Sequence, residues 1–138
     1  VLVEVLNKGK STATTEVTGE ARIEASSLTS IDKPKALQAV MGDDELYNDL
    51  LNDFLELEDE LNALKQAIDN RDFPSIARNA HIFTTALRYI GAYTLAELAS
   101  SIELTIKRNE HKTADKLSNQ LEVLYNALLE LREKVKKR

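Results

Sequence analysis

The chain has 138 residues, of which 43 % are hydrophobic and 30 % are charged. This composition suits one globular domain with a tail and excludes a wholly disordered polypeptide. The net charge of −5 argues against nucleic acid or an anionic membrane surface as the main partner. The absence of cysteine excludes disulfide and thiolate chemistry, and no apolar run approaches the roughly 20 residues of a membrane-spanning helix.

Residues 1–30 are predicted to be a linker or the tail of a preceding domain. The stretch from Lys8 to Ser30 is rich in Ser, Thr and small residues and has no lasting hydrophobic period, which is typical of a linker. The segment VLVEVLN before it, residues 1–7, is too short to distinguish a strand from the end of a preceding domain. Because the chain begins at Val1 and not at Met, we expect an excised fragment or a processed chain.

The first helix is predicted directly after this segment. From Ile31 onward the chain looks helical. Asp32 is expected to cap a short helix that has Pro34 in its first turn and runs to about Met41. Gly42 is expected to end it.

One long helix is predicted next, from an aspartate cap at residue 43 or 44 to about residue 68. Its acidic residues crowd into the first half and its first lysine is Lys65, an order that the helix dipole favours. Leu51 and Leu55 widen its apolar stripe, so we expect it to touch two neighbours. Its main apolar positions are Leu46, Leu50, Phe54, Leu57, Leu61, Leu64 and Ile68.

Three further helices show the same helical periodicity. Pro74 stands in the first turn of the first of them, and Gly91 ends it. The polar run 107–112 is the turn before the last helix. The core positions are Ile76, Ala80, Phe83, Leu87 and Ile90 in the first helix, Leu95, Leu98, Ala99, Ile102 and Ile106 in the second, and Leu117, Leu121, Leu124, Leu128, Leu131 and Val135 in the last.

These elements predict an all-α fold. Four long amphipathic helices with short loops indicate an up-down-up-down antiparallel four-helix bundle over residues 31–138, with the short N-terminal helix capping one end. About 100 residues can bury a single core of this kind.

His81 lies within the core pattern of its helix without belonging to it. At about 100° per residue it falls roughly 140° from the centre of the apolar stripe, so we expect it on a solvent-accessible face of the bundle. A histidine in such a place is usually a plain surface residue. The residues expected on the same face are Ala77, Arg78, Thr84, Thr85 and Arg88.

Other candidate sites are weaker. His111 lies in a polar turn without acidic or histidine partners at ligand spacing, and we expect a plain surface residue. A di-iron bundle would need Glu three residues before a histidine, and neither His81 nor His111 has one. No phosphate-binding glycine loop, serine-hydrolase motif or zinc motif is present. We therefore expect no metal site.

Residues 80–92 read AHIFTTALRYIGA and are followed by LAELA at 95–99 and IE at 102–103. This stretch resembles the motif of the histidine-containing phosphotransfer domain, or HPt domain, of bacterial phosphorelays. The family motif is roughly A-H-x-L-K-G-[SA]-[SA]-x-x-[IL]-G-[AL], followed by L-A-x-L-A-x-x-[IL]-E. GDDELY at 42–47 and NRDF at 70–73 also resemble the family pattern. The resemblance covers about residues 31–138 and implies the four-helix bundle.

The resemblance implies that His81 is a phosphoacceptor on a convex helix face with no pocket. It would take a phosphoryl group from a receiver-domain aspartate and pass it to another receiver, as a phosphotransfer protein and not a free-standing enzyme. The domain itself would bind no cofactor, because the partner receiver supplies Mg²⁺. We expect a monomer without nucleic-acid or direct membrane contact, cytoplasmic, and the C-terminal module of a hybrid sensor kinase whose parent protein is anchored in the inner membrane.

Two positions depart from the family pattern. Thr84 replaces a lysine that supports the phosphorylated imidazole, and Thr85 replaces a glycine that lets the receiver approach closely. Arg78 and Arg88 can restore the positive charge, since guanidinium binds phosphate well. The docking face is expected to include these four residues, Ala77, and Glu103 of the neighbouring helix.

Two hypotheses therefore remain open. The first is a working phosphorelay intermediate. The second is a degenerate HPt-like module that docks a receiver or kinase without being phosphorylated.

Overall fold

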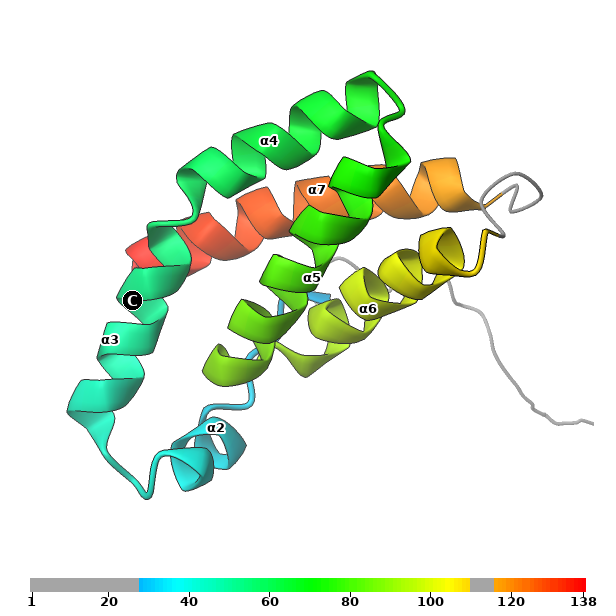
Figure 1. Cartoon of the computed structure of the whole chain (residues 1–138). Coiled ribbons are helices and arrows are strands. Elements are labelled where there is room, and N and C mark those ends of the chain that lie inside the picture. The colour runs from blue at the N-terminus through cyan, green and yellow to red at the C-terminus, as the bar shows by residue number, and fades with distance from the viewer. Residues whose placement is uncertain (1–27, 110–115) are drawn as a thin grey trace, which may run out of the picture.

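The computed structural model describes residues 28–109 and 116–138. In these residues it contains six helices and no strand (Figure 1). The helices are α2 (Lys33–Ala39), α3 (Asp44–Leu55), α4 (Glu58–Asp69), α5 (Phe73–Ile90), α6 (Tyr93–Lys107) and α7 (Leu117–Lys136). The predicted all-α fold is confirmed. His111 and residues 1–27 of the predicted linker lie outside the described residues.

Helix α5 runs through the middle of the molecule in Figure 1. It packs along α6 on one side and against α3 and α4 on the other, while α7 contacts α3, α4 and α6. The short helix α2 contacts α3 and α5. The four long segments of the bundle are thus α3 with α4, then α5, α6 and α7, and α2 is the short N-terminal helix of the predicted architecture.

Aspartate side chains begin three of the helices. The Oδ1 atoms of Asp32, Asp43 and Asp72 accept hydrogen bonds from the backbone N–H three residues later, at 3.1, 3.1 and 3.3 Å. Such caps satisfy amides that the first helical turn leaves without partners. The cap predicted at residue 43 or 44 is Asp43.

The single long helix predicted from residue 43 or 44 to residue 68 is wrong. The helix is interrupted between α3 and α4, at Glu56 and Leu57, although neither residue is proline or glycine. Carbonyls at the end of a helix lack an amide partner, and Arg132 of α7 donates from Nη2 to the carbonyl oxygen of Leu55 at 3.2 Å. A guanidinium from a distant helix thus stabilises the break, and helix breaks commonly have such an inserted group.

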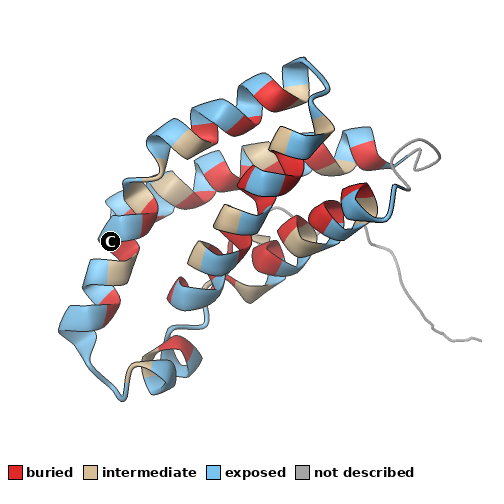
Figure 2. Ribbon diagram, viewed as in Figure 1, coloured by how far each residue is buried: buried red, intermediate tan, exposed pale blue. Residues whose placement is uncertain are grey.

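The core lies between the helices, on the faces shown in red in Figure 2. All five core positions predicted in α5 and all six predicted in α7 are buried. In α3 the stripe is shifted: Leu46 is 43 % exposed and Leu50 is half-buried, whereas Tyr47 is buried. The hydroxyl of Tyr47 donates to the carbonyl oxygen of Ile90 at 2.7 Å, which turns the tyrosine inward and the neighbouring leucine outward.

The turn between α5 and α6 depends on Gly91. Its φ of +92° is a left-handed conformation that side chains other than glycine disfavour. Its carbonyl oxygen accepts a hydrogen bond from the backbone N–H of Asp32 at 2.9 Å, which docks the start of α2 onto the turn. The α2 segment and α3 therefore both contact the C-terminal end of α5, the helix that carries His81.

The segment before α2 also contacts the bundle. Thr29 is buried, and its carbonyl oxygen accepts a hydrogen bond from Nζ of Lys134 in α7 at 2.8 Å. Contacts with the bundle thus begin before Ile31, while the assignment of residues 1–30 as a linker stays a prediction. No helix within the described residues has the length and apolar character needed to cross a membrane.

Replacing Gly91 by alanine is expected to destabilise the fold more than replacing Gly42. Both glycines have positive φ, so alanine is strained at both and Gly42→Ala should cost about 1 kcal/mol. Only at Gly91 would the new Cβ meet other atoms, 2.7 Å from the backbone oxygen of Asp32. Gly91→Ala should therefore cost about 1–3 kcal/mol more, as overpacking does. Urea denaturation measures both losses, and equal losses would contradict the close docking of α2 on this turn.

Candidate functional site

His81 projects from the exposed side of α5. Its side chain is 66 % exposed, whereas Ala80 and Phe83 on the opposite side are buried. The prediction that the His81 side chain is accessible to solvent is therefore confirmed.

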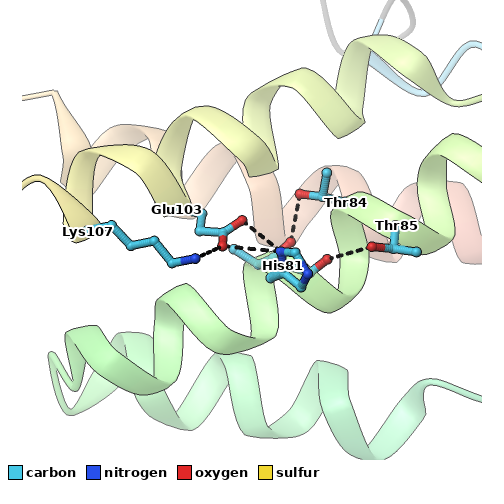
Figure 3. A network of polar contacts seen from close by, with 6 residues as sticks. His81, Thr84, Thr85, Glu103 and Lys107 are labelled. Carbon is cyan, nitrogen blue, oxygen red and sulfur yellow. Dashed lines mark hydrogen bonds and ion pairs between the residues drawn. The ribbon is translucent and has the colours of Figure 1, made fainter.

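A carboxylate from the neighbouring helix holds the imidazole ring (Figure 3). Nδ1 of His81 lies 3.2 Å from Oε1 and 3.2 Å from Oε2 of Glu103 in α6. Nζ of Lys107, one turn further along α6, lies 2.6 Å from the same Oε2. The three side chains form a chain of polar contacts along the line where α5 and α6 meet.

Glu103 is a largely buried acid, with only 8 % of the residue exposed. Burial raises the pKa of its carboxyl, but hydrogen bonds from Lys107 and His81, together with their charges, outweigh burial and hold that pKa below its ordinary value of 4.5. Glu103 is therefore ionised at neutral pH. The two partners compensate for the cost of burying its charge.

The ionised carboxylate fixes the tautomer of His81. A carboxylate only accepts hydrogen bonds, so Nδ1 must be the donor. In a neutral imidazole the lone pair then lies on the other nitrogen, Nε2. The arrangement leaves His81 with one oriented nitrogen and one nucleophilic nitrogen on an exposed side chain.

Two of the residues predicted to share the exposed face of His81 are buried instead. Thr84 is 3 % exposed and its hydroxyl donates to the carbonyl oxygen of Ala80 at 2.8 Å. Ala77 is 7 % exposed. Both are buried because α5 packs against helices on two sides, so its buried surface is wider than a single apolar stripe.

The other predicted neighbours are exposed. Arg78 donates from Nη2 to Oγ of Ser75 at 3.1 Å, and Arg88 lies two turns after His81. The hydroxyl of Thr85 donates to the carbonyl oxygen of His81 at 3.3 Å, which keeps its branched side chain beside the histidine. These three residues and His81 make up the accessible part of the predicted docking face.

Two shallow grooves flank His81, and neither is an enclosed cavity. One groove of about 500 Å³ lies between α5 and α6 and is lined in part by Arg78, His81, Glu103 and Lys107. A second groove of about 250 Å³ lies on the other side, between α3 and α5. It is mainly apolar and is lined by residues that include Leu50, Leu57, Ile82, Thr85 and Tyr89.

Comparison with known families identifies the domain. The sequence profile described as the Hpt domain matches residues 49–133, which is more than half of the chain. The chain belongs to the Hpt domain family. Members of this family carry out histidine phosphotransfer in phosphorelays and interact with receiver domains. Searches of curated proteins and of solved structures gave no match.

Lys107 was missed by the sequence analysis of this Hpt domain. The residue was placed in a polar turn, but it is the last residue of α6 and pairs with Glu103. The signal that could have found it is the four-residue spacing from Glu103, which puts the two side chains on one helix face. Burial of a glutamate at position 103 makes such a partner necessary.

No three His, Asp or Glu side chains come together as metal ligands within residues 28–109 and 116–138. The charged groups that line the groove with His81 in this Hpt domain are one carboxylate, Glu103, and two cations, Arg78 and Lys107. That set suits an anionic ligand near the ring better than a metal ion.

The Glu103→Gln variant of this Hpt domain should lose stability in a pH-dependent way. Because the folded-state pKa of Glu103 lies below 4.5, its charge contributes stability that is fully present above about pH 4.5 and is lost as the pH falls through the folded-state value. The variant should be less stable than the parent by about 1–2 kcal/mol at neutral pH. The difference should shrink below pH 4.5. Urea denaturation at several pH values measures it.

The matched control is Glu97→Gln, which changes an exposed glutamate on the same helix. This control should change the free energy of unfolding by less than about 0.5 kcal/mol at neutral pH. A difference between parent and Glu103→Gln that grows as the pH falls would contradict the assigned ion pairs.

Proposed function

We propose that this Hpt domain is a phosphorelay intermediate that accepts a phosphoryl group on His81 from a receiver aspartate and passes it to another receiver. The observation that carries the proposal is the contact of Nδ1 with the buried, ionised Glu103. It orients the ring and leaves Nε2 as the nucleophile on an exposed face.

The transfer needs only one nucleophile from this domain. The lone pair of Nε2 attacks the phosphorus of an aspartyl phosphate, a P–N bond forms, and the P–O bond to the aspartate breaks. The bonding pair returns to the aspartate carboxylate. The proton on Nδ1 stays in place, so the phosphorylated imidazole is cationic and Glu103 stabilises it. The reverse sequence delivers the phosphoryl group to a second receiver.

The remaining catalytic groups are proposed to come from the receiver. Phosphoryl transfer depends mainly on positioning and on neutralising charge. The receiver would contribute Mg²⁺ and the acceptor or donor aspartate. On the Hpt side, Arg78 lines the same groove as His81 and supports the phosphoryl oxygens, whereas Arg88 lies two turns away and suits contact with the receiver surface.

The receiver is proposed to dock over His81 and the apolar groove beside it. Tyr89 is 57 % exposed and lines this groove with Leu50 and Ile82. An exposed aromatic ring beside an apolar depression is a common anchor in protein interfaces. Thr85 stands between Tyr89 and His81 along α5, so its methyl group becomes part of the contact surface.

We also propose the wider context implied by the family resemblance. The domain would be the C-terminal module of a hybrid sensor kinase on the cytoplasmic side of the membrane. The Ser- and Thr-rich segment before the bundle supports this context, because its composition suits a linker to another module.

Labelling of His81 tests the proposed function. The domain is incubated with Mg²⁺ and phosphorylated receivers from the same organism, and acid-labile phosphate on the domain is measured. The parent should be labelled, and His81→Gln should show none. His111→Gln is the matched control, since the chain has two histidines, and should be labelled like the parent. A domain that binds the receiver but never carries phosphate would establish the degenerate binding module instead.

Truncation of Tyr89 tests the docking surface. Tyr89→Ala should weaken receiver binding about tenfold, the usual effect of removing an interface anchor. Val123→Ala is the control, because Val123 is also an exposed apolar residue, 43 % exposed, but lies on α7. Isothermal titration calorimetry with one receiver compares the dissociation constants. An equal loss for both variants, or a loss only for Val123→Ala, would place the receiver elsewhere.

A further inference from the structure

We propose that Lys107 binds the phosphoryl group once that group is on His81, and so supplies from α6 the positive charge that the family pattern places on α5. This inference rests on the proposed function in one respect, which is that Nε2 of His81 takes a phosphoryl group. It assigns a phosphoryl-binding role to a residue outside the family motif.

The first observation is that Lys107 and His81 share one oxygen atom. Nζ of Lys107 lies 2.6 Å from Oε2 of Glu103, and Nδ1 of His81 lies 3.2 Å from the same atom (Figure 3). The ammonium group and the imidazole ring are therefore on the same side of α6, separated by a single carboxylate oxygen.

The second observation is that Lys107 is free to extend while Glu103 is not. The Lys107 side chain is 61 % exposed, and the Glu103 side chain is 10 % exposed. An ammonium group has three donors on a flexible four-carbon stem, so it can keep a bond to Glu103 and still donate to a second acceptor. The groove that both residues line with His81 has a volume of about 500 Å³, ample for a phosphoryl group.

The third observation concerns the position where relatives carry a lysine. Thr84 is 3 % exposed, and its hydroxyl donates to the carbonyl oxygen of Ala80. A lysine at this position would have the start of its stem buried. A cation at the end of α6 itself reaches the same groove without this conflict, and Lys107 is the residue found there.

A phosphoryl group on Nε2 would add negative charge on the side of the ring away from Glu103, and the nearby carboxylate disfavours this added charge. A cation that reaches the phosphoryl oxygens from the groove offsets the repulsion. Arg78 lines the groove from α5 and Lys107 lines it from α6, so the phosphoryl oxygens would have a donor on each side.

The test uses chemical phosphorylation, so no receiver is needed. Phosphoramidate transfers its phosphoryl group to Nε2 of His81 with loss of ammonia, and the ³¹P resonance is then followed by NMR as the pH is varied. Lys107→Met should raise the pH midpoint of this titration by about 0.5, because a nearby cation favours the less protonated phosphohistidine. Lys107→Arg should keep the midpoint near that of the parent.

Lys65→Met is the matched control. Lys65 also pairs with a carboxylate four residues away, Asp69 at 2.9 Å, but it lies on α4. This control should leave the ³¹P midpoint unchanged. The Cε–Hε resonances of Lys107 should move on phosphorylation while those of Lys65 stay in place.

A second background separates direct binding from simple neutralisation of Glu103. In Glu103→Gln the carboxylate charge is gone, so a lysine that binds the phosphoryl group should still matter, and adding Lys107→Met should again raise the midpoint. If the effect of Lys107→Met vanishes in this background, Lys107 acts only on Glu103 and the inference is wrong. Unchanged Lys107 resonances on phosphorylation would also overturn it.

The outcomes for the two proposals are distinguishable. Labelling by phosphoramidate with the expected Lys107 effect, but no transfer from any receiver, would support the inference and contradict the proposed function. Transfer from a receiver without the Lys107 effect would support the proposed function and contradict the inference. Failure of phosphoramidate and of every receiver to label His81 would overturn both.

Discussion

The tight turn at Gly91 is the constraint on which the rest of the molecule depends. A glycine in a left-handed conformation lets the chain reverse so closely that α6 packs along α5. This pairing puts Glu103 opposite His81, although the two residues are 22 positions apart. The same turn receives the backbone of Asp32 and lies next to the carbonyl that Tyr47 binds, so two other segments hold it in place.

The two paired helices, α5 and α6, contribute different groups to the site. Helix α5 contributes the nucleophilic ring, and α6 contributes a carboxylate that orients the ring and a cation that keeps the carboxylate charged. A largely buried glutamate is stable as an anion only with such partners. The site therefore consists of ordinary surface side chains around one buried charge, and together they present an exposed imidazole.

Hydrophobic periodicity predicted most of the fold correctly. The repeats in α5 and α7 are regular, and every predicted core residue in these helices is buried. The break between α3 and α4 could not be predicted in this way, because the group that stabilises it, Arg132, lies 77 positions from Leu55. The pattern of residues 43–68 is compatible with one helix, and only the tertiary contact decides otherwise.

The candidate site was predictable to a similar degree. The position of His81 on its helix indicated an exposed ring, and the motif pointed to Glu103 on the neighbouring helix. The burial of Thr84 was not predictable from one apolar stripe, because it depends on where α6 lies against α5. The role of Lys107 could not be predicted for a related reason. A lysine beside other polar residues is typical of a turn, and only the burial of its partner Glu103 indicates an ion pair.

The hydrogen bond from Arg132 to the carbonyl oxygen of Leu55, at the break between α3 and α4, also affects the apolar groove beside His81. Residues on both sides of the break, Leu50 in α3 and Leu57 before α4, form one wall of that groove. The angle between the two helices thus shapes the surface next to the histidine, and a side chain of α7 helps to fix that angle. Evolution can therefore reshape the surface offered to a partner by changing α7, without altering any residue that the partner touches.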